Sequence, residues 1–82
     1  MKPRRKELGT ANSIGAKVVA LRKKRGMKQK ELLAQLQSRG VEIGQSALSD
    51  LEGQTRAVKG EEVAALLDIF SISMKELYPK EE

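Results

Sequence analysis

The sequence predicts an all-α fold, because its apolar residues recur at helical spacing and no segment shows the alternation of a strand. Leu32, Leu33 and Leu36 lie at i, i+1 and i+4, on one face of a helix. Leu48 and Leu51 lie three residues apart and mark the buried side of another helix. The 82 residues are expected to form one domain, and a chain this short buries only about 60% of its unfolded surface. Stability should therefore be modest, and a partner subunit would add to it.

The first helix is expected to begin near Ser13, a favourable N-cap residue, and to end at Gly26. Its buried stripe should consist of Ile14, Val18 and Leu21. Basic residues crowd its last turn, where the negative end of the helix dipole favours cations.

The next three helices are expected over residues 29–38, 45–52 and 60–70, with Gly40 ending the first of them. Two adjacent glutamates open the last of the three, and such a pair can serve catalysis or metal binding. No third ligand and no histidine accompany them, so we interpret them as favourable charges at the positive end of the helix dipole. A capping box over residues 73–76 begins a short fifth helix.

The helix over 45–52 carries a polar face opposite its leucines. The residues that share this face are Gln45, Ser46, Ser49 and Asp50. Most of these short side chains both donate and accept hydrogen bonds, whereas a face meant only for water usually carries Lys and Glu. Such a face suits the floor of the DNA major groove.

Charge is unevenly distributed along the chain, whose net charge is +5. Residues 1–30 hold eleven Lys and Arg against Glu7 alone, a net of +10. Residues 31–82 hold five basic against ten acidic residues, a net of −5. The basic half is therefore expected to face a polyanion, although a basic run can also serve only to keep a small protein in solution.

The chain is expected to divide into a flexible basic arm over residues 1–11, a domain over 12–79 and an acidic tail over 80–82. Arms of this kind lie along phosphates or enter a minor groove, and the alternative is an inert terminus. The arm residues expected to contact phosphate are Arg4, Arg5 and Lys6.

Over residues 13–78 the sequence resembles the helix-turn-helix DNA-binding domain of the Cro and phage-repressor (XRE-like) family. The residues that carry the resemblance are Leu21, Arg22, Gly26, Met27, Lys28, Gln29, Glu31, Leu32, Ile43, Leu48, Ser49, Leu51, Glu52, Arg56, Val58, Val63, Leu66, Ile72, Ser73, Glu76 and Leu77. The resemblance implies a compact five-helix, repressor-like domain in which the helix over 45–52 is the recognition helix. In the family, an arginine late in the first helix pairs with the glutamate that ends the recognition helix, which here implies a structural ion pair between Arg22 and Glu52.

Specific roles follow for the expected DNA contacts. Gln45 is expected to be the main base-reading residue, because residues at the start of a recognition helix reach base edges and glutamine binds adenine N6 and N7. Ser46 and Ser49 are expected to contact bases or phosphate, and Asp50 either accepts from cytosine N4 or is solvated. The resemblance implies a phosphate contact at Gln29, with a solvated side chain as the alternative. The other residues expected to bind phosphate are Lys28, Arg56 and Lys59.

The sequence departs from the family pattern in three places. The connection over 37–42 is longer than the family's tight turn. Lys28 and Gly44 stand where helix-capping Ser or Thr is usual. Gln54 stands where a glycine is usual, and Gly53 lies one residue earlier.

The function expected is a sequence-specific DNA-binding transcriptional regulator, most often a repressor, acting as a homodimer on double-stranded DNA. An alternative keeps the fold as a protein-interaction module, such as the antitoxin of a toxin pair or a polymerase adaptor, with Met74, Leu77 and Tyr78 in the contact face. An enzyme is not expected, because the chain has no His, Cys or glycine-rich phosphate loop, and neither a cofactor nor a metal is expected. No apolar run approaches the roughly 20 residues that span a bilayer, and the absence of cysteine fits a cytoplasmic location.

Overall fold

The computed structural model describes residues 9–78, in which the chain forms five helices and no strand. The helices are α1 (Gly15–Lys24), α2 (Gln29–Ser38), α3 (Gln45–Glu52), α4 (Gly60–Phe70) and α5 (Met74–Leu77). The prediction of an all-α, five-helix fold is confirmed, and α2, α3 and α4 begin and end at the expected residues. Arg4, Arg5, Lys6 and the acidic tail lie outside the described residues.

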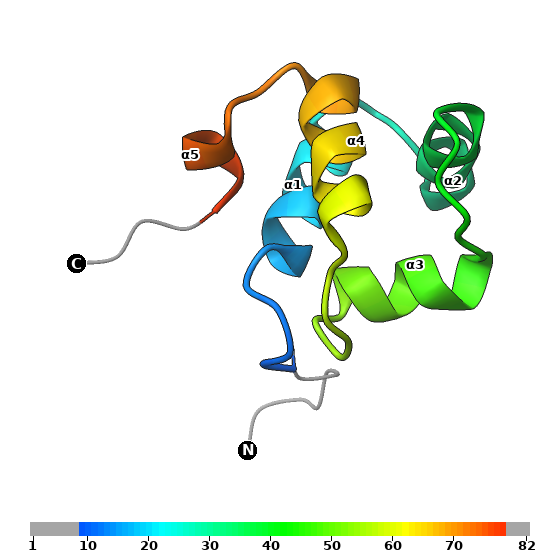
Figure 1. Cartoon of the computed structure of the whole chain (residues 1–82). Coiled ribbons are helices and arrows are strands. Elements are labelled where there is room, and N and C mark those ends of the chain that lie inside the picture. The colour runs from blue at the N-terminus through cyan, green and yellow to red at the C-terminus, as the bar shows by residue number, and fades with distance from the viewer. Residues whose placement is uncertain (1–8, 79–82) are drawn as a thin grey trace.

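The core forms where α1 packs against α3, and α2 packs against both α3 and α4 (Figure 1). Figure 1 shows α3 at the lower edge of the molecule, beneath α2 and α4, while α5 lies on the opposite side. The buried apolar side chains are Ile14, Val18, Leu32, Leu36, Val41, Ile43, Leu48, Leu51, Val63, Ala65, Leu66, Phe70 and Leu77. All five helices therefore contribute side chains to the core.

Helix α1 begins at Gly15, and its start differs from the expectation that Ser13 would be the N-cap. The side-chain Oδ1 of Asn12 accepts hydrogen bonds from the backbone N–H groups of Ile14, at 3.0 Å, and Gly15, at 2.9 Å. Asn12 thus satisfies two N–H groups that the first turn of a helix leaves without a partner. Its Nδ2 donates to the carbonyls of Leu51 and Arg56, which ties the start of α1 to the end of α3 and the segment after it.

Two glycines end the helices that precede α3. Gly26 and Gly40 have φ of 67° and 87°, the left-handed region that costs glycine least. After Gly40, the N–H of Val41 donates to the carbonyl of Leu36, and Gly40 itself donates to Gln37. This Schellman pattern stops α2 and turns the chain toward α3, as the sequence predicted for Gly40.

The long connection from α2 to α3 is fixed by its own side chains. Val41 and Ile43 are buried in the core. The amide of Gln37 donates to the carbonyl of Ile43 at 2.9 Å, so the end of α2 holds the chain just before α3. The added length of this helix-turn-helix connection is therefore accommodated by two apolar anchors.

Glutamates at the third helical position cap the N-terminal ends of α2, α4 and α5. Glu31 accepts from the backbone N–H of Lys28 at 2.7 Å, and Glu62 accepts from that of Lys59 at 2.9 Å. In α5, Glu76 accepts from Ser73 at 2.9 Å, as expected for the capping box. These bonds satisfy backbone donors at the positive ends of the helices, although lysine replaces the usual Ser or Thr before α2 and α4.

Candidate nucleic-acid interface

Helix α3 has one buried and one exposed face. Its leucines and Glu52 are buried. The residues expected to read bases are exposed, and they are Gln45, Ser46, Ser49 and Asp50. The helix therefore presents hydrogen-bonding side chains outward while its apolar side is held in the core, an arrangement that suits insertion into a major groove.

A chain of hydrogen bonds links the exposed start of α3 to the interior. The Nε2 of Gln45 donates to Oε1 of Gln29, at the first position of α2. The Nε2 of Gln29 donates in turn to Oε1 of Glu52 at 2.8 Å. The expected base-reading glutamine and the expected phosphate-binding glutamine thus lie side by side. Their amides are oriented by a buried carboxylate, which the sequence alone did not indicate.

That carboxylate belongs to the ion pair between Arg22 and Glu52. The guanidinium binds it through two parallel bonds, Nε to Oε2 at 2.8 Å and Nη2 to Oε1 at 3.1 Å. The side chains are only 12% and 6% exposed. Nη1 of Arg22 also donates to the carbonyl of Met27. A two-pronged contact fixes direction as well as distance, so this pair sets the angle of α3 on α1.

Arg56 forms a second cluster of hydrogen bonds that contacts α3. Its Nε donates to the carbonyl of Ala47 within α3 at 2.9 Å, and its Nη1 donates to Ala57. Nη1 and Nη2 each reach a carboxylate oxygen of Glu62 at 2.9 Å. Most of the donors of Arg56 are therefore used within the fold. This differs from the phosphate contact expected from the sequence, and it makes Arg56 a residue that positions α3.

Glu62 is buried, and opposing effects act on its pKa. Burial raises the pKa of a carboxyl, but the hydrogen bonds from Arg56 and the backbone of Lys59, together with their charges, lower it by more. The pKa of Glu62 consequently lies below its ordinary value. Glu62 is thus a carboxylate bound by the fold, and in residues 9–78 no group of three or more His, Cys, Asp or Glu is placed to hold a metal.

Two exposed lysines stand just before the helices that flank the recognition face. Lys28 precedes α2, and Lys59 precedes α4. Their backbone N–H groups donate to glutamates, and both residues are exposed at the surface. Cations at these positions suit contacts to a phosphate backbone.

The C-terminal end of α3 is enclosed by the segment before α1, a feature that the sequence did not reveal. Gln54 has φ of 60°, and its Oε1 accepts from the backbone N–H of Ala16 at 2.9 Å. Its Nε2 donates to the carbonyl of Gly9, and the backbone of Gly9 donates to Gly53 at 2.9 Å. A Cβ on Gly15 would lie 2.4 Å from the carbonyl oxygen of Leu51. Residues 9–11, placed in the arm by the sequence, are thus joined to the α3–α4 connection.

Comparison with known proteins gives one match, to a family. The model of the Cro/C1-type HTH DNA-binding domain matches residues 17–79. Comparisons with curated proteins and with solved structures gave no significant match. No helix among the described residues is long and apolar enough to cross a membrane. With five helices, an exposed polar face on α3 and the family match over most of its length, the chain belongs to the Cro/C1-type helix-turn-helix DNA-binding family.

Proposed function

We propose that this protein is a sequence-specific transcriptional regulator, acting as a repressor, that reads the DNA major groove with α3. The observation that carries the proposal is the link from Gln45 through Gln29 to Glu52. A side chain held before binding loses less conformational entropy on binding, so an oriented glutamine suits a bidentate contact to adenine. Exposed Ser46 and Ser49 extend the reading face along α3.

Phosphate contacts supply affinity and register in this proposal. Lys28 and Lys59 reach the phosphate backbone from the starts of α2 and α4. Nε2 of Gln29 donates one hydrogen to Glu52 and has a second hydrogen to donate to a phosphate. Arg4, Arg5 and Lys6 add sequence-independent attraction. Arg56 acts indirectly, because its hydrogen bond to the carbonyl of Ala47 helps to hold α3 in place.

The regulator is proposed to act as a two-fold dimer on a near-palindromic site. Half-sites about 34 Å apart, one helical turn of DNA, match a dimer of this motif. Dimerisation is assigned to the side of the molecule that carries Met74, whose side chain is 54% exposed. The side chain of Leu77 is buried and belongs to the core.

The test combines selection of DNA with two matched variants. Selection from random DNA should enrich a near-palindrome, and Gln45→Ala should weaken binding to that site by about 1–3 kcal/mol. The variant should lose much less affinity for random DNA, because phosphate contacts are unchanged. Gln35→Ala removes an exposed glutamine from α2 and should leave both affinities unchanged. Equal weakening on selected and random DNA by Gln45→Ala would show that α3 does not read the bases.

A further inference from the structure

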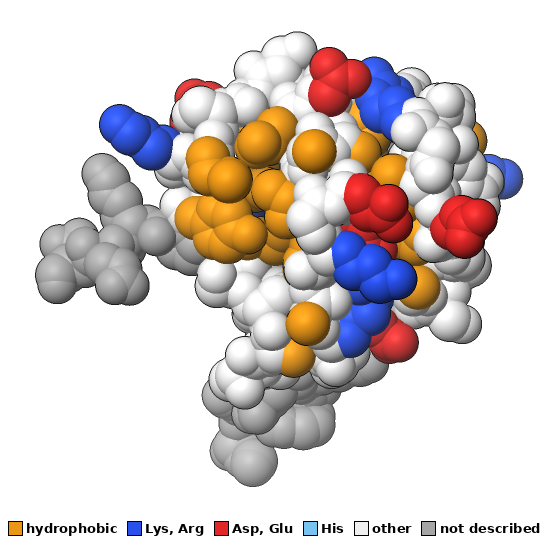
Figure 2. Space-filling model, viewed as in Figure 1, with side chains coloured by type: hydrophobic (Ala, Val, Ile, Leu, Met, Phe, Trp, Pro, Cys, Tyr) orange, Lys and Arg blue, Asp and Glu red, His pale blue; other side chains and the backbone are white. Residues whose placement is uncertain are grey.

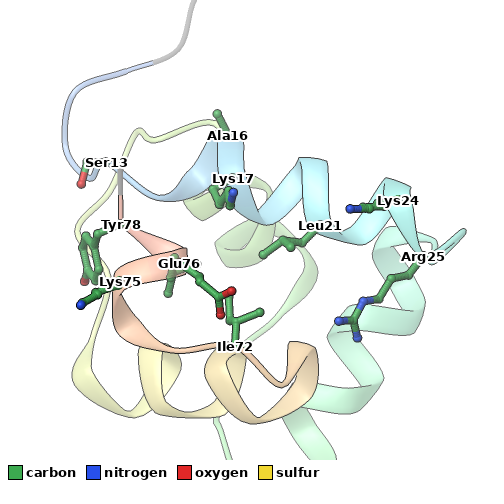
Figure 3. A pocket seen from close by; sticks show the side chains of 11 residues that line it. Ser13, Ala16, Lys17, Leu21, Lys24, Arg25, Ile72, Lys75, Glu76 and Tyr78 are labelled. Carbon is green, nitrogen blue, oxygen red and sulfur yellow. The ribbon is translucent and has the colours of Figure 1, made fainter. Parts of the chain in front are cut away.

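A groove of about 970 Å³ separates α1 from the chain that forms α5. Side chains from the two segments point toward one another across it, among them Leu21 from α1 and Ile72 from the residues before α5 (Figure 3). Lys17, Lys24 and Lys75 stand along it. None of the proposed base-reading residues of α3 lines this groove.

The floor of this groove is apolar. Leu21 and Ile72 are half-buried and pack against the core. Tyr78 closes one end. Figure 2 shows hydrophobic side chains gathered on the surface in the region between α5 and α4 of Figure 1. Apolar surface in a groove gives the apolar side chains of a partner a place to pack.

The rim of the groove is basic. Lys17, Lys24 and Lys75 are exposed, and none of them forms an ion pair within the described part of the chain. Arg25 closes the other end, where its guanidinium donates to the carbonyl of Phe70 at 2.6 Å and lies 5.2 Å from the centre of that ring. The one carboxylate in the lining, Glu76, accepts from the backbone of Ser73. The groove therefore combines an apolar floor with a surplus of positive charge.

We infer that the groove between α1 and α5 docks an acidic amphipathic helix from a partner protein. A helix of this kind places its apolar stripe on Leu21 and Ile72 and its carboxylates beside the lysines of the rim. Nucleic acid fits less well, because phosphate gains nothing from an apolar floor. A second copy of this chain also fits less well, because the acidic helix α4 already buries Val63, Leu66 and Phe70 in its own core.

Docking there leaves the DNA-binding face free. On α1, the side that carries Ile14, Val18 and Arg22 turns inward toward the core and α3. Lys17, Leu21 and Lys24, at i, i+4 and i+7, line the groove on another side of the same helix. The inference does not depend on DNA binding, and the partner helix and DNA are expected to bind at the same time.

The experiment uses the full chain and a synthetic peptide of about 16 residues, long enough to become helical on docking. The peptide carries Leu at i, i+3, i+4 and i+7 with Glu elsewhere, and a scrambled peptide keeps the composition but breaks the apolar stripe. Fluorescence anisotropy should detect binding of the first peptide and not of the second. Chemical-shift changes should be concentrated at Ala16, Leu21 and Ile72.

Charge reversals give the matched control. The double variant Lys17→Glu/Lys24→Glu should weaken peptide binding by about tenfold or more, because like charges then face each other. Lys23→Glu/Lys30→Glu makes the same change in net charge at exposed lysines outside the groove, and should weaken it by less than about twofold. Circular dichroism checks that both variants are folded.

Several results would overturn the inference. Equal binding of the scrambled peptide would reduce the effect to charge alone, and equal weakening by the two double variants would place the contact elsewhere. Binding of neither peptide would show that the groove takes no such helix. A DNA affinity that falls as much as peptide affinity in Lys17→Glu/Lys24→Glu would make the rim a nucleic-acid surface. A dimer that this variant breaks, seen by sedimentation, would make a second copy the occupant.

Discussion

The last two residues of α3 are buried, whereas the first two residues of the helix are exposed. Leu51 and Glu52 are buried, and the carbonyl of Leu51 accepts from Nδ2 of Asn12 at 3.2 Å. At the other end Gln45 and Ser46 are exposed, and Gly44 offers no side chain to cap the helix. The hydrogen bond from Gln45 to Gln29 joins that exposed end to α2.

The two ends of this eight-residue helix therefore have different roles, one in orienting the helix and the other in binding a ligand. The buried end fixes the direction of α3 through contacts with α1 and with the segment before it. The open end carries exposed hydrogen-bond donors and acceptors that can bind a ligand. Substitutions at the buried end should therefore change the free energy of unfolding, and those at the open end should change DNA affinity with little effect on stability.

The largest effect is expected from breaking the pair of Arg22 and Glu52. Arg22→Met or Glu52→Gln should lower the free energy of unfolding by about 3–4 kcal/mol, because each leaves a nearly buried charge without its partner. The matched control is Arg39→Met. Arg39 pairs with Asp68 at 2.7 Å, but the two side chains are 32% and 69% exposed. Its loss should cost less than about 1 kcal/mol. Equal losses in urea denaturation would show that burial does not distinguish the pairs.

The next largest effect on stability is expected where α1 closely approaches the buried end of α3. Gly15→Ala should destabilise the fold by about 2–3 kcal/mol, because the new Cβ would lie 2.4 Å from the carbonyl oxygen of Leu51 and 2.7 Å from that of Glu52. Gly60 is likewise the first residue of its helix, and a Cβ there meets no described atom within 4 Å. Gly60→Ala should leave thermal stability unchanged or raise it slightly. A Gly15→Ala variant as stable as Gly60→Ala would contradict the close contact between α1 and α3.

A smaller, pH-dependent effect is expected where Arg56 and Glu62 support the side of α3. The folded pKa of Glu62 is lowered from the ordinary value of 4.5, so its contribution is fully present above that pH and is lost as the pH falls through the folded pKa. At pH 7, Glu62→Gln should cost about 1–2 kcal/mol of unfolding free energy.

The cost of Glu62→Gln should shrink as the solution is acidified below pH 4.5, measured by urea denaturation at each pH. Glu61→Gln, a change at the exposed neighbour, should cost less than about 0.5 kcal/mol. A difference between wild type and Glu62→Gln that stayed constant down to pH 3 would contradict the lowered pKa.

Short-range sequence patterns predicted the helices. The features that they did not predict depend on contacts between residues far apart in the sequence. The bounds of α2 and α3 follow from leucines at helical spacing and from Gly40, all of which are visible in short windows. The side chain of Asn12, rather than that of Ser13, caps the start of α1, and Asn12 also donates to the carbonyl of Leu51 at the end of α3. The roles of Arg56 and Gln54 depend on partners brought close only by tertiary packing, which periodicity does not report.

Gln54 provides the smallest and most informative test, because two effects oppose each other there. Its φ of 60° is costly for a residue with a Cβ, by about 1 kcal/mol. Its side chain compensates, since Oε1 accepts from Ala16 and Nε2 donates to Gly9 across the end of α3. Each of these partly exposed bonds should contribute about 0.5–1 kcal/mol.

Gln54→Ala keeps the strained backbone and loses both bonds, so it should lower the free energy of unfolding by about 1–2 kcal/mol. Gln54→Gly loses the same bonds but relieves the backbone, and should stay within about 1 kcal/mol of wild type. In both variants the amide of Ala16 should exchange with solvent hydrogen faster. If glycine were clearly stabilising, the side-chain bonds would contribute nothing. If glycine and alanine cost the same, the left-handed backbone would carry no strain, and the glutamine would close the buried end of α3 through its side chain alone.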